Sequence, residues 1–217
     1  MSFSVVTESW PVLLQGLGVT LLLSVLTIMG GTIVGLLVGL ARANGPAPLR
    51  ALARIYIEIF RGTPLLIQLL FVYFGAYSLG FEWSSTLAAA ATSLILYEGA
   101  YIAEIFRAGI EAVPVAQREA AQVLGLRKST IFTRVVLPQA MQIARAPLVG
   151  QYIGLVKDTS LATVVGLAEL MRQGQAIVDR TAQPLPVYLA VAALYFCICY
   201  PMSLFVRHME RKAPVRA

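Results

Sequence analysis

The chain has 217 residues, of which 58% are hydrophobic and only 13% are charged, and its formal net charge is +6. A soluble domain carries about 25% charged residues because water must wet its surface. This composition therefore excludes an ordinary soluble globule and predicts that lipid covers much of the surface. The positive charge raises two further possibilities, binding of nucleic acid and contact with an anionic membrane.

Five stretches are long and apolar enough to cross a hydrocarbon core, which takes roughly 20 residues of helix. The first is 9–41, which contains no charged residue, and the second is 62–81. The third, 83–106, is interrupted by Glu98 and Glu104, and the fourth, 147–167, is unusually polar. The fifth is 181–206. The sequence thus predicts an all-α integral membrane protein with five transmembrane helices.

The basic residues are concentrated in the connections on one side of these spans. Of the 17 basic residues, 14 lie in three segments. These segments are 42–61, 107–145 and the tail from Arg207, which includes Arg211, Lys212 and Arg216. Because Lys and Arg accumulate in cytoplasmic loops, the N-terminus is expected outside, and the 107–145 loop and the C-terminus in the cytoplasm. The N-terminal MSFSVVTESW lacks the basic region of a secretory signal, so we expect the first apolar run to be retained.

A short helix is predicted inside the 107–145 loop. Pro114 suits the start of a helix and Gly125 suits the left-handed position that follows one, with about ten residues between them. Ala116, Ala120 and Val123 share one face of this helix and form a narrow apolar stripe.

Three interpretations of this helix compete. The stretch REAAQVLGLRKSTIFTRVVLPQA, with Gly125 at a turn before a basic second helix, also resembles a DNA-binding helix-turn-helix. That motif needs a soluble three-helix core, however, and the chain returns to the membrane by about Pro147. The helix could also lie in the membrane interface against its own bundle. We favour a docking helix, in which Ala120 and Ala121 let a partner's groove approach and Glu119 pairs with a basic group.

The residues that carry this prediction resemble the EAA loop of ABC importer permeases. Glu119-Ala120-Ala121, Gly125 and the ending Val135-Val136-Leu137-Pro138 have the spacing of that motif. Three more stretches, FRGTPLLIQLLFVYFG (60–75), AYIAEIFRAGIEAVP (100–114) and LVKDTSLATVVGLAEL (155–170), look like the polar amino-acid branch of the histidine and glutamine type.

The resemblance implies that 1–217 is a single permease domain in a bacterial cytoplasmic (inner) membrane. Two such subunits, identical or related, would sit on two ATP-binding cassette subunits, and an extracytoplasmic solute-binding protein would deliver the substrate. The helix at about 115–125 would be the coupling helix, contacting the ATPase through Ala116, Glu119, Ala120, Ala121, Leu124 and Gly125. ATP and Mg would belong to that partner, because this chain contains no G-x-x-x-x-G-K-[ST] phosphate loop.

Charged residues within the predicted spans need a reason, since each costs about 2.5–3.5 kcal/mol at the bilayer centre. The fourth span contains four polar residues in a row, Lys157, Asp158, Thr159 and Ser160. They predict a polar or unwound part of that span, which lines the substrate pathway. Alternatively, the charges of Lys157 and Asp158 could form ion pairs with other helices. Glu98 could face the pathway and favour a cationic group, or be satisfied by Arg or Tyr side chains inside the bundle.

Other features have simpler explanations. Glu58 with Arg61, and Glu104 with Arg107, are expected as ion pairs at the ends of spans. Gly31, Gly35 and Gly39 form a small-residue stripe that would serve close packing within the bundle or a dimer seam.

Two other classes of function are weaker alternatives. We find no motif of a membrane-embedded enzyme. Cys197 and Cys199, two residues apart, would point to different sides of a helix, so a mutual disulfide is not expected. A self-contained ion-coupled carrier or channel, with the loop as an interfacial helix, is the remaining alternative; such carriers usually show an internal repeat, which we do not see.

Overall fold

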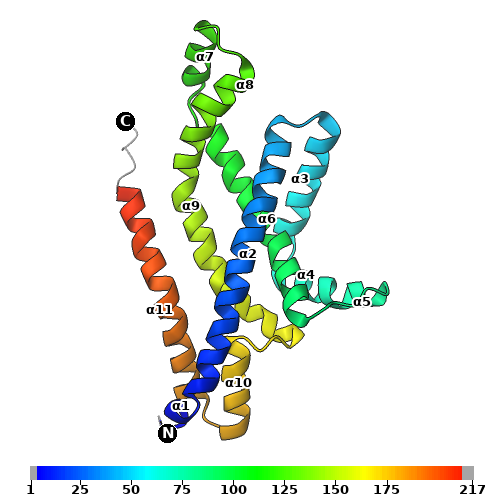
Figure 1. Cartoon of the computed structure of the whole chain (residues 1–217), viewed down its shortest axis with the longest axis vertical. Coiled ribbons are helices and arrows are strands. Elements are labelled where there is room, and N and C mark those ends of the chain that lie inside the picture. The colour runs from blue at the N-terminus through cyan, green and yellow to red at the C-terminus, as the bar shows by residue number, and fades with distance from the viewer. Residues whose placement is uncertain (1–3, 212–217) are drawn as a thin grey trace.

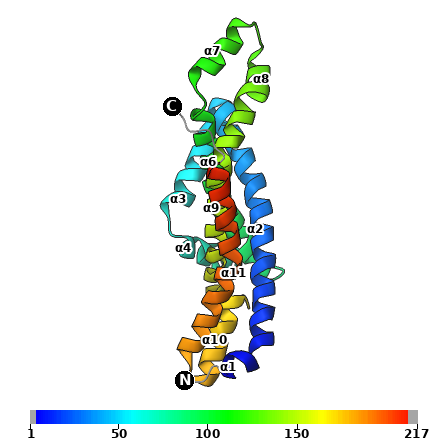
Figure 2. The same ribbon diagram turned by 90° about the vertical axis from the view of Figure 1, so that its left-hand side faces the viewer.

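The computed structural model describes residues 4–211, and these residues form helices and short connections with no β-strand among them. The basic tail residues Lys212 and Arg216 lie outside the described part. The helices run along one long axis, with the hairpin of α7 (Val115–Val123) and α8 (Lys128–Ile131) at one end and α1 (Ser4–Glu8) and α10 (Leu170–Thr181) at the other (Figures 1 and 2).

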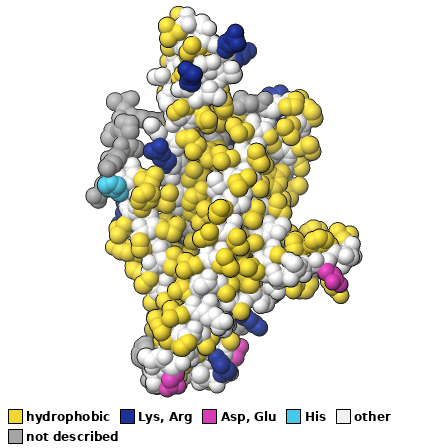
Figure 3. All heavy atoms as spheres, viewed as in Figure 1, with side chains coloured by type: hydrophobic (Ala, Val, Ile, Leu, Met, Phe, Trp, Pro, Cys, Tyr) yellow, Lys and Arg dark blue, Asp and Glu magenta, His cyan; other side chains and the backbone are white. Residues whose placement is uncertain are grey.

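Within residues 4–211, three helices are long and apolar enough to cross a membrane. They are α2 (Trp10–Asn44), α6 (Thr86–Glu111) and α11 (Pro184–Arg211), and they correspond to the first, third and fifth predicted spans. On the face seen in Figure 3, hydrophobic side chains cover the middle of the molecule and most charged side chains lie toward its ends. The predicted class of an all-helical membrane protein is confirmed.

The second predicted span, 62–81, follows a sharp bend, and the residues before it, predicted as a connection, are largely helical. Helix α3 (Ala47–Gly62) ends at Thr63, and the chain continues at an angle of 109° as α4 (Leu65–Leu70), the π-helix η1 (Phe71–Gly75) and α5 (Ala76–Ser78). Thr63 is extended, with φ −122° and ψ 148°, because a residue that precedes proline avoids the helical region. The α4–α5 segment therefore projects sideways from the body (Figure 1).

The bend between α3 and α4 is held by one side chain. The Gln68 amide donates hydrogen bonds to the Phe60 carbonyl at 2.8 Å, the Thr63 carbonyl at 3.0 Å and the Thr63 hydroxyl at 2.7 Å. These acceptors belong to the end of α3, where helix carbonyls lack partners in the chain. Gln68 thus joins the end of one helix to the start of the next.

The fourth predicted span begins earlier in the structure than the sequence indicated. Helix α9 (Leu137–Asp158) contains Pro147 in its interior, where the prediction had placed a helix start. The α-helix ends at Asp158, and Thr159–Val165 continue as a 3₁₀ segment, η3, that stops at Gly166 with φ +84°. The predicted irregular stretch is therefore present, at the end of α9.

Helices α2 and α6 form the most extensive contact in the bundle. Gly31, Gly35 and Gly39 are all buried against α6, and a Cβ atom added at Gly35 would lie 2.6 Å from the side chain of Ile102. The glycine stripe therefore serves packing within this chain, and its interpretation as a dimer seam is wrong.

Candidate functional site: the hairpin and the polar cluster in the bundle

The loop helix predicted at about 115–125 corresponds to α7, which covers Val115–Val123. Pro114, with φ −54° and ψ 135°, sits immediately before the helix. At the other end Gly125 has φ +74°, its N–H bonds to the Gln122 carbonyl at 2.9 Å, and the Leu126 N–H bonds to the Ala121 carbonyl at 3.2 Å. This pair of hydrogen bonds is the Schellman arrangement that ends helices at glycine.

The six predicted contact residues of this helix do not share one environment. Ala116, Glu119, Ala120, Leu124 and Gly125 are exposed. Ala121 is buried and packs with Val113, Ile131, Val136 and Ala140 in a small core of the hairpin. Ala121 therefore stabilises the hairpin, and the expectation that both alanines open the helix backbone to a partner applies only to Ala120.

Large apolar side chains extend the exposed face of α7. Val115 is 65% exposed, Val123 is 87% exposed and Leu124 is 78% exposed. Glu119 lies on the same helix and forms no ion pair with any residue of 4–211. Because α7 packs chiefly on α8 and η2 and lies at the tip of the molecule (Figure 1), this face has no cover from the bundle. Exposed apolar surface of this kind marks sites of protein contact.

A second group of polar residues lies between α6 and α9. Glu98 is fully buried, and both of its carboxylate oxygens accept hydrogen bonds from the Gln151 amide, at 3.1 and 3.2 Å. Asp158 is close enough to interact electrostatically with Glu98 and Tyr97. The hydrogen-bond partner of Glu98 is thus an amide, and not the Arg or Tyr side chain of the alternative in which Glu98 is satisfied inside the bundle.

The structure separates the four polar residues 157–160. Lys157 and Ser160 line a mainly apolar cavity of about 570 Å³ against α10 and α11, together with Tyr188 and Tyr195. Thr159 is buried and donates its hydroxyl proton to the Val156 carbonyl at 2.7 Å. Asp158 lies on the Glu98 side. Neither charge forms an ion pair with a residue of the described chain, so these residues do not pair with other helices as the alternative interpretation required.

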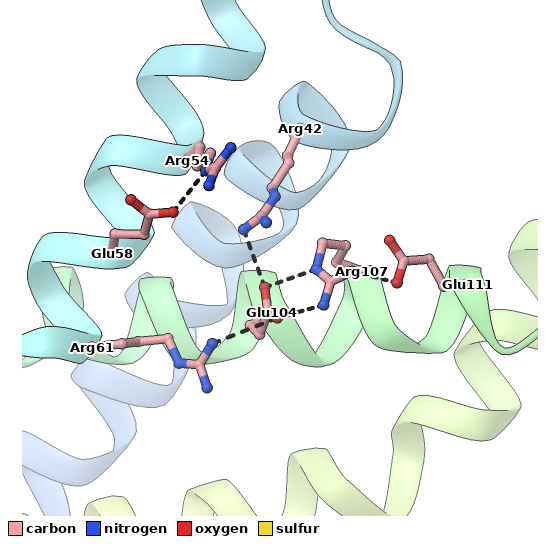
Figure 4. A network of polar contacts seen from close by, with 7 residues as sticks. All are labelled: Arg42, Arg54, Glu58, Arg61, Glu104, Arg107 and Glu111. Atoms are coloured by element: carbon pink, nitrogen blue, oxygen red, sulfur yellow. Dashed lines mark hydrogen bonds and ion pairs between the residues drawn. The ribbon is translucent and has the colours of Figure 1, made fainter.

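A network of charges joins α2, α3 and α6 near the hairpin end (Figure 4). Glu104 contacts Arg107 at 2.6 Å, Arg42 at 3.2 Å and Arg61 at 3.5 Å. The predicted pair of Glu104 with Arg107 is confirmed. The predicted pair of Glu58 with Arg61 is wrong, because Glu58 binds Arg54 at 2.7 Å and Arg61 turns toward Glu104.

Sequence reasoning missed the buried carboxyl group of Glu169. It accepts hydrogen bonds from the N–H groups of Met171 and Arg172 at the start of α10 and from the Tyr195 hydroxyl of α11. Burial raises the pKa of Glu169, and these donors oppose that rise. An acidic residue directly before the run that forms α10 was the available signal, since such residues often cap helices.

Comparison with known proteins places these features in one family. Residues 31–214 match the model of the binding-protein-dependent transport system inner membrane component family. The chain is 37% identical over 215 residues to the glutamine transport system permease protein GlnP of Escherichia coli K12, covering 98% of both chains. It is also 37% identical over 206 residues to the L-cystine transport system permease protein TcyB of Bacillus subtilis, covering 94% of this chain and 87% of the relative.

Solved structures agree with this assignment. The crystal structure of an amino acid ABC transporter with histidines superposes with a TM-score of 0.92 and 33% identity, covering 98% of this chain and 99% of the other. The MetNI methionine ABC transporter shares the fold, with a TM-score of 0.75 at 22% identity over 96% of this chain and 99% of the other. The chain therefore belongs to the family of binding-protein-dependent transport system inner membrane components.

Proposed function

We propose that this chain is the membrane-spanning permease subunit of an ATP-driven importer of polar amino acids. Two relatives that match nearly the whole chain are named as amino-acid permeases, for glutamine and for cystine. The similar crystal structure is that of an amino acid ABC transporter. These names support an amino acid as the class of substrate and do not distinguish one amino acid from another.

In this proposal the chain crosses the membrane five times. Helix α9 is the fourth span: its 22 residues make a rod about 33 Å long, enough for a hydrocarbon core about 30 Å thick. Arg145, Lys157 and Asp158 make it more polar than the other spans. The bent pair of α3 with α4–α5 is the second span, the N-terminus lies outside, and the hairpin and C-terminus lie in the cytoplasm.

The observation that carries the coupling role is the uncovered apolar face of α7. Val123 and Leu124 are large, apolar and almost fully exposed on the hairpin that projects at one end of the molecule (Figure 1). We propose that this face sits in a groove of an ATP-binding cassette subunit, where Glu119 meets a basic group. Movement of that subunit would then reach the spans through the compact core around Ala121.

The complete transporter in this proposal contains several other chains. Two permease subunits, identical or related, form the two halves of the translocation pathway. Two ATP-binding subunits hold ATP and Mg, and an extracytoplasmic solute-binding protein delivers the amino acid. The chain meets membrane lipid on its outer surface and no nucleic acid.

The polar residues inside the bundle supply the proposed contacts with substrate. Lys157 and Ser160 line a cavity beside α11, and Asp158 approaches from the side of Glu98. A cation and two carboxyl groups suit the charged carboxylate and ammonium groups of an amino acid. Glu98 has no exposed surface here, so its contact with substrate requires another arrangement of the helices. Thr159, also buried, holds the turn of the chain at the end of α9.

Coupling is tested by the ATPase activity of the complex reconstituted in lipid with its binding protein and amino acid. Val123→Asp places a charge in the apolar contact and Glu119→Lys reverses the acidic group. Loss of a central contact costs about 2 kcal/mol or more, so we expect binding of the ATP-binding subunit to weaken by about thirtyfold and stimulation to disappear.

The matched control is Glu82→Lys, the same charge reversal at an exposed residue far from α7. It should leave both properties unchanged. Normal stimulation in the α7 variants, or amino-acid uptake by the chain without any ATP-binding subunit, would contradict the proposal and favour a self-contained carrier.

A further inference from the structure

A cavity of about 200 Å³ lies under the hairpin, on the side that faces the ends of α2 and α6. Its polar lining consists of Arg118 and Gln122 of α7 and Lys128 of α8, and its apolar lining includes Ile110 and Phe132. A water molecule takes about 30 Å³ of liquid volume, so the cavity is large enough for a small polar group with a few atoms attached. The proposed coupling role does not use it.

The two cations of this cavity have no acidic partner in residues 4–211. One Arg118 nitrogen, Nη2, donates to the Ile110 carbonyl at 2.6 Å, while Nε is buried and makes no hydrogen bond within the described chain. Lys128 forms no ion pair there. Of the two acidic residues between 107 and 145, Glu111 is bound to Arg107 and Glu119 is exposed and unpaired. Buried donors and clustered charges normally have partners, so this cavity calls for an anion.

The cavity lies where the apolar spans end. Ala43, one of its lining residues, is the last residue of the apolar stretch of α2, and Ile110 is one residue from the end of α6. In the proposed arrangement of the spans, this is the level of the phosphate groups of the cytoplasmic leaflet. The segment between Arg107 and Arg145 holds six basic and two acidic residues, and such juxtamembrane basic segments attract anionic lipid.

We propose that this cavity binds the phosphate group of an anionic phospholipid. Arg118 and Lys128 would hold the phosphate oxygens, and the Arg118 Nε would gain its missing acceptor. Ile110 and Phe132 would contact the glycerol and the first carbons of an acyl chain. This mixed lining favours a lipid over free inorganic phosphate, which apolar walls cannot hydrogen-bond.

The lipid would contact both the hairpin and the ends of α2 and α6. It would therefore stabilise the position of the hairpin relative to the spans. The proposal stands apart from the coupling role, because it concerns the inner side of the hairpin and not the exposed face of α7.

The test measures lipid binding to the full chain after removal of lipid in detergent, by native mass spectrometry. The probes are phosphatidylglycerol, phosphatidylcholine with the same acyl chains, and inorganic phosphate. Lys128→Gln should weaken binding of phosphatidylglycerol by about fivefold, the loss expected for one basic residue near the membrane surface. Arg118→Gln should weaken it further.

Arg127→Gln is the matched control, because it removes one charge from the neighbouring residue, which is exposed and does not line the cavity. It should leave binding unchanged. The Lys128 side chain is exposed and forms no ion pair within residues 4–211, so we expect its variant to fold and to remain informative if Arg118→Gln fails to fold.

Three results would overturn the proposal. An equal loss in Arg127→Gln would mean general attraction of the basic surface. Binding of inorganic phosphate as tight as that of phosphatidylglycerol would identify a free anion as the ligand. Unchanged lipid binding in both cavity variants, together with weaker binding of the ATP-binding subunit, would assign the two cations to that partner.

Discussion

Glu104 brings three arginines from three helices to one carboxylate. Its side chain is 21% exposed, and it lies between Arg42 of α2, Arg61 of α3 and Arg107 of α6 (Figure 4). Its contact with Arg107 could be predicted, because residues three apart share a helix face. The contacts with Arg42 and Arg61 could not be predicted, since they depend on how α2 and α3 pack on α6.

We expect Glu104→Gln to destabilise the protein by about 1–3 kcal/mol, because it leaves partly buried donors without a charged acceptor. The measurement is thermal unfolding in detergent. Glu58→Gln is the control, since Glu58 is 59% exposed and has one partner on its own helix. Such a surface pair contributes about 0.3–0.5 kcal/mol. Equal effects of the two substitutions would show that the Glu104 network does not hold the helices together.

We expect the carboxyl groups of Glu98 and Asp158 to contact the amino-acid substrate and to determine which amino acids the transporter accepts. Glu98→Gln keeps the size of the side chain and its contact with Gln151. Asp158→Asn keeps the size of the Asp158 side chain. Each should change the affinity for the amino acid, or the selectivity among amino acids, more than assembly of the complex. The assay is amino-acid-stimulated ATPase activity in lipid, and unchanged profiles for both variants would reject this assignment.

At the scale of the elements, the predicted spans 9–41, 83–106 and 181–206 agree with α2, α6 and α11 to within a few residues at each end. The breaks were harder to place. Pro64 lies between the end of α3 and the first residue of α4, where the chain turns by 109°. Proline signals a break without giving its angle, which here depends on Gln68, a residue with no local pattern to identify it.

The start of α9 was also predicted at the wrong place. Pro147 was expected to begin the fourth span, yet it lies inside a continuous helix. Proline within a helix is unfavourable but tolerated in membranes, because neighbouring helices can satisfy the freed backbone groups. Similarly, the spacing of 157–160 predicted a polar segment but not which side chain faces α6 and which faces α11.

Packing of α2 on α6 depends on the absence of a side chain at Gly35. Gly35→Ala should destabilise the protein by about 1–3 kcal/mol, the usual cost of overpacking, because its Cβ would lie 2.6 Å from Ile102. Gly18→Ala is the control on the same helix, where a Cβ would meet no atom within 4 Å. It should be neutral or stabilising, since alanine favours helix. Thermal unfolding in detergent compares the two, and equal midpoints would contradict tight packing at Gly35.

The whole molecule has one end that differs from the rest. The hairpin of α7 and α8 extends beyond the middle of the molecule, which hydrophobic side chains cover on the face seen in Figure 3, and it carries the exposed Val123 and Leu124. The presence of a separate hairpin at this end could be predicted from the sequence, because the basic loop and its Pro and Gly boundaries are local features. The burial of Ala121 could not, since it requires the second half of the hairpin to fold back on α7.

The central claim is that α7 contacts an ATP-binding subunit, and cross-linking in native membranes tests it most directly. A photoreactive amino acid at Val123 should form a covalent adduct with the ATP-binding subunit, and the yield should change when ATP is bound. Because that subunit lies in the cytoplasm, the adduct would also establish the orientation of the chain. The same group at Tyr77, which is 69% exposed on the α4–α5 segment, should give no such adduct. An adduct from Val123 only with lipid or with this chain itself would contradict the account.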